Sequence, residues 1–135
     1  PAMAGWAAAI KELSPTVNAR NEKAAELKQR AAKKIIDLGG EILSPEISSP
    51  HILTAAFMGY VSENIVHFLE KKEIYVSTGS ACSSKKASAT FTALGLEKYS
   101  QSALRLSFCD DTTEEDIDNF ARALEEALGS LLKKK

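Results

Sequence analysis

Apolar and polar positions follow a helical period most clearly between residues 18 and 38. Apolar residues recur there three or four positions apart, and charged residues fill the other positions. The apolar positions are Ala24, Leu27, Ala31, Ile35 and Leu38. Gly39-Gly40 follows directly, and glycine is common just after a helix end. The pattern therefore predicts a helix over residues 18–38 that ends at these glycines.

Three further segments are expected to be helical. Ser62 is placed to cap a helix that runs to about Lys71. A second helix is expected from Ala87 to Leu94, ended by Gly95. The last begins at Thr112-Thr113-Glu114-Glu115-Asp116, a capping-box sequence with acidic residues in its first turn. Its buried stripe is expected at Ile117, Phe120, Leu124, Leu128 and Leu131.

Four short segments are expected to be strands: residues 41–43, 51–57, 73–77 and 103–108. In the last of these, Leu104 and Leu106 alternate with Arg105 and Ser107, which is the period of a strand with one buried face. The mixture of helices and short strands predicts an α+β fold. We expect a small mixed or antiparallel sheet covered by helices, in a single domain that takes in residues 1–135.

Composition narrows the range of partners. The chain has 135 residues and a formal net charge of −1, which argues against nucleic acid or an anionic membrane as the main partner. No apolar run approaches the ~20 residues needed to span a bilayer. Cys82 and Cys109 are isolated and match neither a disulfide framework nor a metal-ligand pattern. We expect a reducing, cytoplasmic setting.

The first residues are unusually apolar. Residues 1–13 are small and apolar on most sides, with Trp6 and Ile10 at helical spacing. Such a segment would expose a patch that normally packs against something. We therefore interpret the chain as one cut out of a longer protein.

Cys82 is the first candidate for chemistry. A free cysteine is more often a small buried hydrophobic residue, but the small, polar neighbours of Cys82 favour exposure. At a pKa of ~8.5 only a few per cent of a thiol is ionised at neutral pH. Lys85, Lys86 and the start of the following helix would favour the thiolate, although each charge at ~4 Å is worth only about 1 kcal/mol in water. Full activation would have to come from elsewhere.

Arg105 is the second candidate. A solvated arginine on an open sheet face is the commoner interpretation, and a bidentate clamp for a carboxylate is the functional one. His51 and His67 lack partners at ligand spacing, so we interpret both as structural. Cys109 precedes Asp110-Asp111, whose charges are expected to raise its pKa, and we interpret it as inert.

The stretch around Cys82 resembles a known active-site loop. Tyr75-Val76-Ser77-Thr78-Gly79-Ser80-Ala81-Cys82-Ser83-Ser84 is similar to the cysteine loop of the cysteine desulfurases, which are pyridoxal-phosphate enzymes of the class V aminotransferase family. The resemblance is to the branch with a long mobile loop, which serves iron–sulfur cluster assembly and tRNA thiolation. Other blocks agree in order: Ser49-Pro50-His51-Ile52-Leu53, Ala93-Leu94-Gly95-Leu96, Leu104-Arg105-Leu106-Ser107-Phe108 and Thr112-Thr113-Glu114-Glu115-Asp116-Ile117-Asp118.

This resemblance implies a fold and a reaction. The fold would be that of the C-terminal small domain of fold-type I pyridoxal-phosphate enzymes, with residues 1–16 leading in from an absent large domain, residues 17–135 as the small domain and residues 78–86 as its mobile cysteine loop. Cys82 matches the nucleophile that takes sulfur from L-cysteine as a persulfide and releases alanine. Arg105 matches the residue that holds the substrate carboxylate. The implied partners of the full-length enzyme are a sulfur-acceptor protein and a second copy in a homodimer.

The family's cofactor-binding residues have no match in this sequence. Lys85 and Lys86 lie on the cysteine loop and cannot replace the family's cofactor-binding lysine. We therefore expect pyridoxal phosphate in the full-length enzyme, none bound to this fragment, and no turnover by the fragment alone. Two alternatives remain open: a stand-alone persulfide carrier that works without the cofactor, and a relative similar to selenocysteine lyase.

Overall fold

The computed structural model describes residues 1–78 and 89–133. Four antiparallel strands form one sheet in the order β1-β2-β4-β3. The strands are β1 (Glu41–Ile42), β2 (Ile52–Ala56), β3 (Ser77–Thr78) and β4 (Ala103–Ser107). The helices are α1 (Ala2–Leu13), α2 (Val17–Asp37), α3 (Ser62–Glu70), α4 (Ala89–Ala93) and α5 (Glu114–Ser130), with short 3-10 turns at Ser14–Thr16 and Glu97–Tyr99. The α+β prediction is confirmed, and the sheet is antiparallel.

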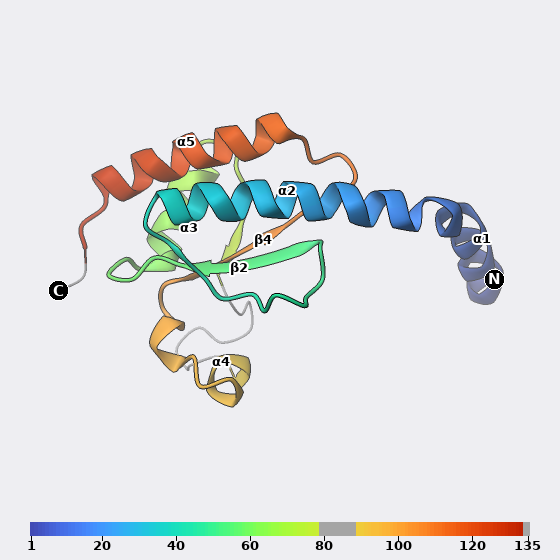
Figure 1. Cartoon of the computed structure of the whole chain (residues 1–135), viewed down its shortest axis with the longest axis horizontal. Coiled ribbons are helices and arrows are strands. Elements are labelled where there is room, and N and C mark those ends of the chain that lie inside the picture. Colours follow the sequence, from blue (N-terminus) through green and yellow to red (C-terminus); the bar gives the residue numbers. More distant parts are fainter. Residues whose placement is uncertain (79–88, 134–135) are drawn as a thin grey trace.

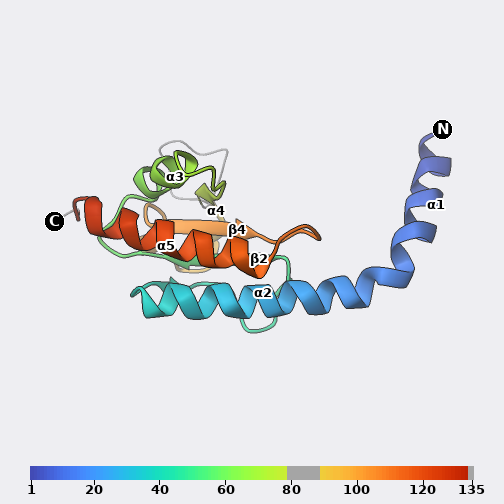
Figure 2. The same ribbon diagram turned by 90° about the horizontal axis from the view of Figure 1, so that it is seen from above.

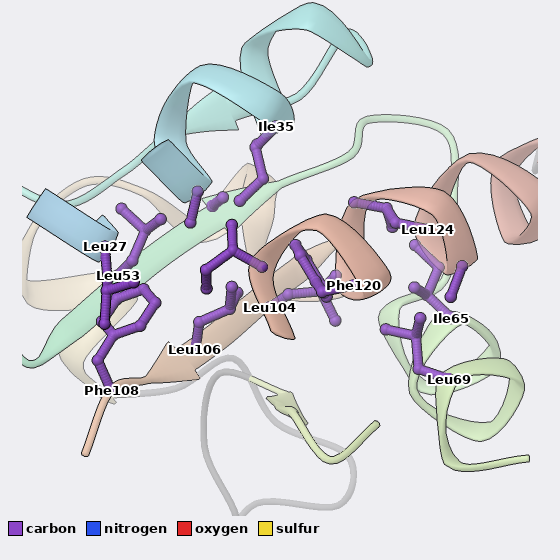
Figure 3. Packing of buried hydrophobic residues seen from close by; sticks show 14 of the residues in the cluster. Leu27, Ile35, Leu53, Ile65, Leu69, Leu104, Leu106, Phe108, Phe120 and Leu124 are labelled. Atoms are coloured by element: carbon purple, nitrogen blue, oxygen red, sulfur yellow. The ribbon is translucent and has the colours of Figure 1, made fainter. Parts of the chain in front are cut away.

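The two long helices α2 and α5 form a layer on one face of the sheet (Figure 1). Helices α2 and α5 run side by side above β2 and β4, while α4 lies on the opposite side of the sheet (Figures 1 and 2). The main core lies between this helical layer and the sheet, where Leu53, Leu104 and Leu106 meet Ile35 and Leu124 (Figure 3). Burial of these side chains supplies most of the stabilisation of the fold.

Helix α2 has the period that the sequence predicts. Its buried positions are Ala24, Leu27, Ala31 and Ile35. Gly39 follows the helix at a φ of 82°, a conformation that favours glycine. Gly40 is needed for a different reason, because a Cβ there would lie 2.6 Å from Ile35 Cγ2 and 2.8 Å from Phe57 Cζ. The two glycines therefore end the helix and let the chain turn closely against the core.

Helix α5 begins with the capping box that its sequence predicts. The Asp116 backbone N–H donates to Thr113 Oγ1 at 3.2 Å, and the Thr113 N–H donates to Asp116 Oδ2 at 2.8 Å. That second bond is the main cause of a lowered pKa for Asp116. Arg30 of α2 donates to Glu114 at 2.8 Å and to Asp118 at 2.7 Å, so charged side chains join the two long helices beside the core.

Some local predictions are wrong. Ser62 does not cap α3: Val61 takes the cap position, no side chain caps the helix, and Ser62 is buried while its N–H donates to Gln101 O at 2.8 Å. The strand expected over residues 73–77 is reduced to Ser77–Thr78, and Glu73 takes a φ of 61°. Leu131 lies just past the end of α5, although it still packs against the core.

The helix expected over residues 87–94 is observed as α4, Ala89–Ala93, and residues 87 and 88 lie outside the described part of the chain. Gly95, which the sequence places at its end, has a φ of 67°.

Helix α1 projects away from the rest of the molecule (Figures 1 and 2). It has no buried residue, and Trp6 is 72% exposed. Met3, Ile10 and Leu13 are exposed as well, and together with Trp6 they repeat at helical spacing. The apolar patch expected from the sequence is therefore present as an uncovered helix. No helix in the described residues is long and apolar enough to cross a membrane.

Candidate functional site

Arg105 lies in the middle of β4, which has a strand on each side. In the antiparallel register, Arg105 is opposite Thr54 of β2 and opposite Ser77 of β3. Leu104 and Leu106 on either side of it point into the core and are buried. Arg105 therefore points to the face of the sheet that α2 and α5 do not cover, as its alternation predicts.

Among the described residues, one end of this face is buried and the other end is exposed. Ala56 and Ala103 occupy the next row of the sheet and are fully buried. Glu41 belongs to the same row, and its carboxylate accepts a hydrogen bond of 2.6 Å from the hydroxyl of Tyr99, which is itself buried. The row on the other side of Arg105 holds Ile52 and Ser107, which are exposed. Arg105 is half-buried at the boundary between the covered and open parts of this face.

Arg105 has no anionic partner among the described residues, unlike several other cations. Arg20 pairs with Asp110 at 2.5 Å, Arg30 with Glu114 and Asp118, and Lys72 with Glu126 at 2.7 Å. A half-buried guanidinium without a carboxylate keeps its forked set of N–H donors available for a ligand. Within the described part of the chain, the Arg105 guanidinium thus has no anion beside it.

Cys82 and nearly all of the predicted loop over residues 78–86 lie outside the described residues. The described chain leads directly to this segment, because β3 ends at Thr78. The structure therefore places Arg105 next to the strand that precedes Cys82.

Cys109 differs from its prediction. It is exposed, and its pKa is lowered instead of raised. The largest cause of the lowered pKa is the side chain of Thr112, whose Oγ1 lies 3.4 Å from Cys109 Sγ. The backbone N–H of Asp111 also favours the thiolate. The negative charge of Asp111 raises the pKa, but it is the smallest of the causes. Asp110 does not act as the sequence suggests, because its carboxylate pairs with Arg20.

Both histidines have hydrogen-bond partners, distant in sequence for His51 and local for His67. His51 Nδ1 lies 3.1 Å from Phe108 O and its Nε2 lies 2.9 Å from Asn21 Oδ1, so the ring joins β2 and the end of β4 to α2. His67 Nδ1 lies 3.1 Å from Glu70 Oε2 on the surface of α3. Within the described part of the chain, no group of three or more His, Cys, Asp or Glu residues is placed to hold a metal ion.

A groove with a volume of about 620 Å³ lies elsewhere. It runs between residues 72–76 and α5, and Leu106 and Phe108 line it from the core side of the sheet. Thr54, Ser77 and Arg105 are not part of its lining. The groove and the open face at Arg105 are separate features.

The described residues do not fit a pyridoxal phosphate site. A lysine that binds this cofactor has to reach its aldehyde in an enclosed pocket, and every described lysine is at least partly exposed. Lys28 and Lys72, for example, are engaged at the surface with Ser48 and Glu126. We therefore assign no step of a reaction on that cofactor to the described residues.

The sequence alone did not single out Thr54 and Ser77. Thr54 sits within an apolar strand, and Ser77 is one of several small polar residues before Cys82. Their proximity to Arg105 depends on the strand register, which local sequence does not specify.

Comparisons with known proteins agree with this fold. Residues 1–120 match the family model described as aminotransferase class-V. The chain is 35% identical over 131 residues to the "NifS/IcsS protein homolog" of Lactobacillus delbrueckii subsp. bulgaricus, covering 93% of this chain and 34% of that protein. It is 32% identical over 118 residues to the "Cysteine desulfurase IscS" of Pseudomonas putida, covering 84% of this chain and 29% of the relative.

Solved structures show the same similarity. A "NIFS-LIKE PROTEIN" superposes with a TM-score of 0.75 at 30% identity, over 91% of this chain and 31% of that one. A NifS-like protein from Rickettsia africae, at 21% identity, has the same fold with a TM-score of 0.73, over 85% of this chain and 31% of the other. The chain thus spans about a third of the length of the curated relatives and solved structures it matches. On the family match over residues 1–120, this chain belongs to the class-V aminotransferase family.

Proposed function

We propose that this chain is the small-domain part of a pyridoxal-phosphate-dependent cysteine desulfurase. Relatives that bear this name match most of the chain, and the chain corresponds to less than a third of their length. The stretch from Ser77 to Cys82 has the composition of a loop that presents a thiol. The cofactor would be bound by another part of the parent enzyme, because the described residues offer no site for it.

Cys82 is the residue that accepts sulfur in this proposal. Its thiolate forms a bond to the sulfur of L-cysteine, and the carbon–sulfur bond of the substrate breaks. The electron pair of that bond stays with carbon, which takes up a proton, and the carbon skeleton leaves as alanine. The sulfur remains on Cys82 as a persulfide and passes to an acceptor protein, in iron–sulfur cluster assembly or tRNA thiolation.

Arg105 holds the carboxylate of L-cysteine in this proposal. The observation that supports it best is the register in which Ser77 lies opposite Arg105, because Cys82 comes only five residues after Ser77. Five residues span at most ~17 Å when fully extended, so the thiol is tethered within reach of a substrate held by Arg105.

The exposed apolar side chains of helix α1 favour a larger parent protein and argue against a stand-alone persulfide carrier. A carrier that acts alone would be expected to have a polar surface here, but Trp6 and Met3 are among the most exposed apolar side chains described. We propose that residues 1–16 pack against another part of the parent enzyme, and that the enzyme is a homodimer. A reducing compartment, the cytoplasm, suits a mechanism that needs a free thiol at Cys82.

The test uses the enzyme that contains this chain, with release of alanine and formation of persulfide as readouts. Cys82→Ser should abolish both, since a hydroxyl cannot carry the sulfur. Cys109→Ser is the matched control and should leave both near the wild-type level, because Cys109 lies past the end of β4 and makes its contacts with residues 111 and 112. Wild-type turnover by Cys82→Ser would refute the assigned nucleophile.

A further inference from the structure

The segment of residues 89–100, which contains α4, lies on the face of the sheet opposite α2 and α5 (Figures 1 and 2). The backbone N–H groups of residues 94, 95, 96, 99 and 100 all donate to carbonyl groups within this segment. The chain joins the rest of the fold just after it, where Gln101 O accepts from the Ser62 N–H at 2.8 Å and Ser102 O accepts from the Phe57 N–H at 3.2 Å. The segment therefore has its own set of backbone hydrogen bonds.

Two aromatic side chains of this segment are buried apart from the main core. Phe91 and Tyr99 are both buried, yet neither belongs to the apolar cluster between the sheet and the two long helices. The same is true of Ala56 and Ala103, which are fully buried. These two alanines point to the face that carries α4, because they alternate with residues that point into the main core. The four side chains are therefore a second, smaller set of buried residues on this face.

A side-chain hydrogen bond ties the segment to the edge strand β1. The hydroxyl of Tyr99 donates to Glu41 Oε2 at 2.6 Å. Glu41 lies opposite Ala56, and Ala56 lies opposite Ala103, so these three residues form one row across β1, β2 and β4. Tyr99 leaves the chain shortly before β4 begins, and two strand spacings amount to about 10 Å. The Tyr99 side chain therefore reaches across β2 to Glu41.

We propose that residues 89–100 open from the sheet as one unit while the main core stays folded, and that the bond between Tyr99 and Glu41 holds the unit closed. Segments with few buried apolar side chains and mostly internal hydrogen bonds open at a lower free energy than the core. Opening uncovers the row of Ala56 and Ala103, which is next to the row of Arg105.

The unit also holds one attachment of the chain that carries Cys82, because Ala89 follows Cys82 by seven residues. Opening would therefore move that attachment relative to Arg105. This consequence rests on the proposed function, in which Cys82 takes sulfur from a substrate held by Arg105. The opening itself does not rest on it and can be measured without turnover.

The test is native-state hydrogen exchange of the 135-residue chain, followed by NMR at several urea concentrations below the unfolding transition. The amides of Leu96 and Tyr99 report on the unit, and the amide of the buried Ile35 in α2 reports on the main core. We expect Leu96 and Tyr99 to exchange through an opening with a weak dependence on urea, and Ile35 through global unfolding with a strong dependence. Equal free energies and equal urea dependence at all three amides would overturn the separate unit.

Two substitutions distinguish the unit from the core. Thr113→Ala weakens the cap of α5 and should speed exchange at Ile35 about fivefold, but leave Leu96 and Tyr99 unchanged, because the cap stays formed when only the unit opens. Tyr99→Phe keeps the ring and loses the bond to Glu41. It should speed exchange at Leu96 and at position 99 about tenfold, a value expected for a hydrogen bond to a charged group.

Tyr75→Phe is the matched control, because it removes the same atom from a tyrosine that is 79% exposed, and it should exchange as the wild type does. Glu41→Gln keeps an acceptor for the Tyr99 hydroxyl, so its exchange at Leu96 should lie between those of the wild type and Tyr99→Phe. Wild-type exchange at Leu96 in Tyr99→Phe would overturn the role of the bond. An equal increase at Leu96 and Ile35 in Thr113→Ala would overturn independent opening. Failure of the proposed function, by contrast, would appear as desulfuration that persists in Cys82→Ser.

Discussion

At the scale of single residues, the reactivity of Cys109 depends on a short local fold. Its backbone N–H donates to Thr112 Oγ1 at 3.0 Å, and Thr112 N–H donates back to Cys109 O at 3.1 Å. This tight turn holds the Thr112 hydroxyl against the sulfur, where it favours the thiolate. Hydrogen bonding thus outweighs the negative charges that follow Cys109 in the sequence.

Thr112→Val should raise the pKa of Cys109. The side chain of Thr112 is the largest cause of the lowered value, and valine keeps its shape without a donor. The measurement is the rate of thiol alkylation against pH in a Cys82→Ser background, so that Cys109 is the remaining thiol. The midpoint of the profile should move to higher pH, and alkylation at neutral pH should slow. Identical midpoints in the two proteins would show that Thr112 does not control the thiol.

The exposure and direction of single side chains could be predicted from the sequence, but their contacts with other residues could not. The exposure of Trp6 and the outward direction of Arg105 follow from helical and strand periods. The lowered pKa of Cys109 depends on how three following residues fold back. The grouping of Thr54 with Arg105 depends on a register between strands about fifty residues apart in sequence, which only the assembled sheet fixes.

At the scale of elements, predicted and observed helix boundaries agree where the sequence carries a strong local signal for a helix end. Helices α2 and α5 begin or end within a residue or so of their predicted positions, because Gly39 and the Thr113 capping box are strong local signals. Ser62 failed as a cap because tertiary packing buries it and takes its N–H to Gln101 O. The strand expected over residues 73–77 is observed only at Ser77–Thr78. Glu73 has a positive φ, which is not an extended conformation, and the alternation of apolar residues does not predict it.

Thr113→Ala should destabilise the chain by about 1 kcal/mol, the usual loss for an N-cap hydroxyl. The mutation removes both the acceptor for the Asp116 N–H and a hydroxyl that donates to Asp116 at 2.8 Å. The free energy of unfolding from urea denaturation followed by circular dichroism checks this. Thr16→Ala is the matched control, because Thr16 holds the N-cap position of α2 without a side-chain cap bond, and it should unfold close to the wild type. Equal losses in both variants would contradict a specific role for the capping box.

At the scale of the whole molecule, the described structure has two unequal parts: a packed body and the uncovered helix α1 (Figure 2). The buried residues belong to the body, from Ala24 onwards. Burial of apolar surface is the dominant favourable term in folding, and α1 contributes none of it. The stability of the body should therefore be nearly independent of α1, while solubility should depend on it.

Deletion of residues 1–16 should leave the free energy of unfolding within about 0.5 kcal/mol of the full chain, as expected for a change away from the core. It should also reduce concentration-dependent association, since it removes the exposed side chains of Met3, Trp6, Ile10 and Leu13. Urea denaturation and sedimentation velocity at several concentrations measure the two effects. Because Trp6 is the single tryptophan and is 72% exposed, its emission should change little while circular dichroism reports unfolding of the body. Two results would show that α1 packs on the body in solution: a large loss of stability on deletion, or a strongly blue-shifted Trp6 emission in the dilute chain. Either result would remove the reason to propose that α1 packs against another part of a parent enzyme.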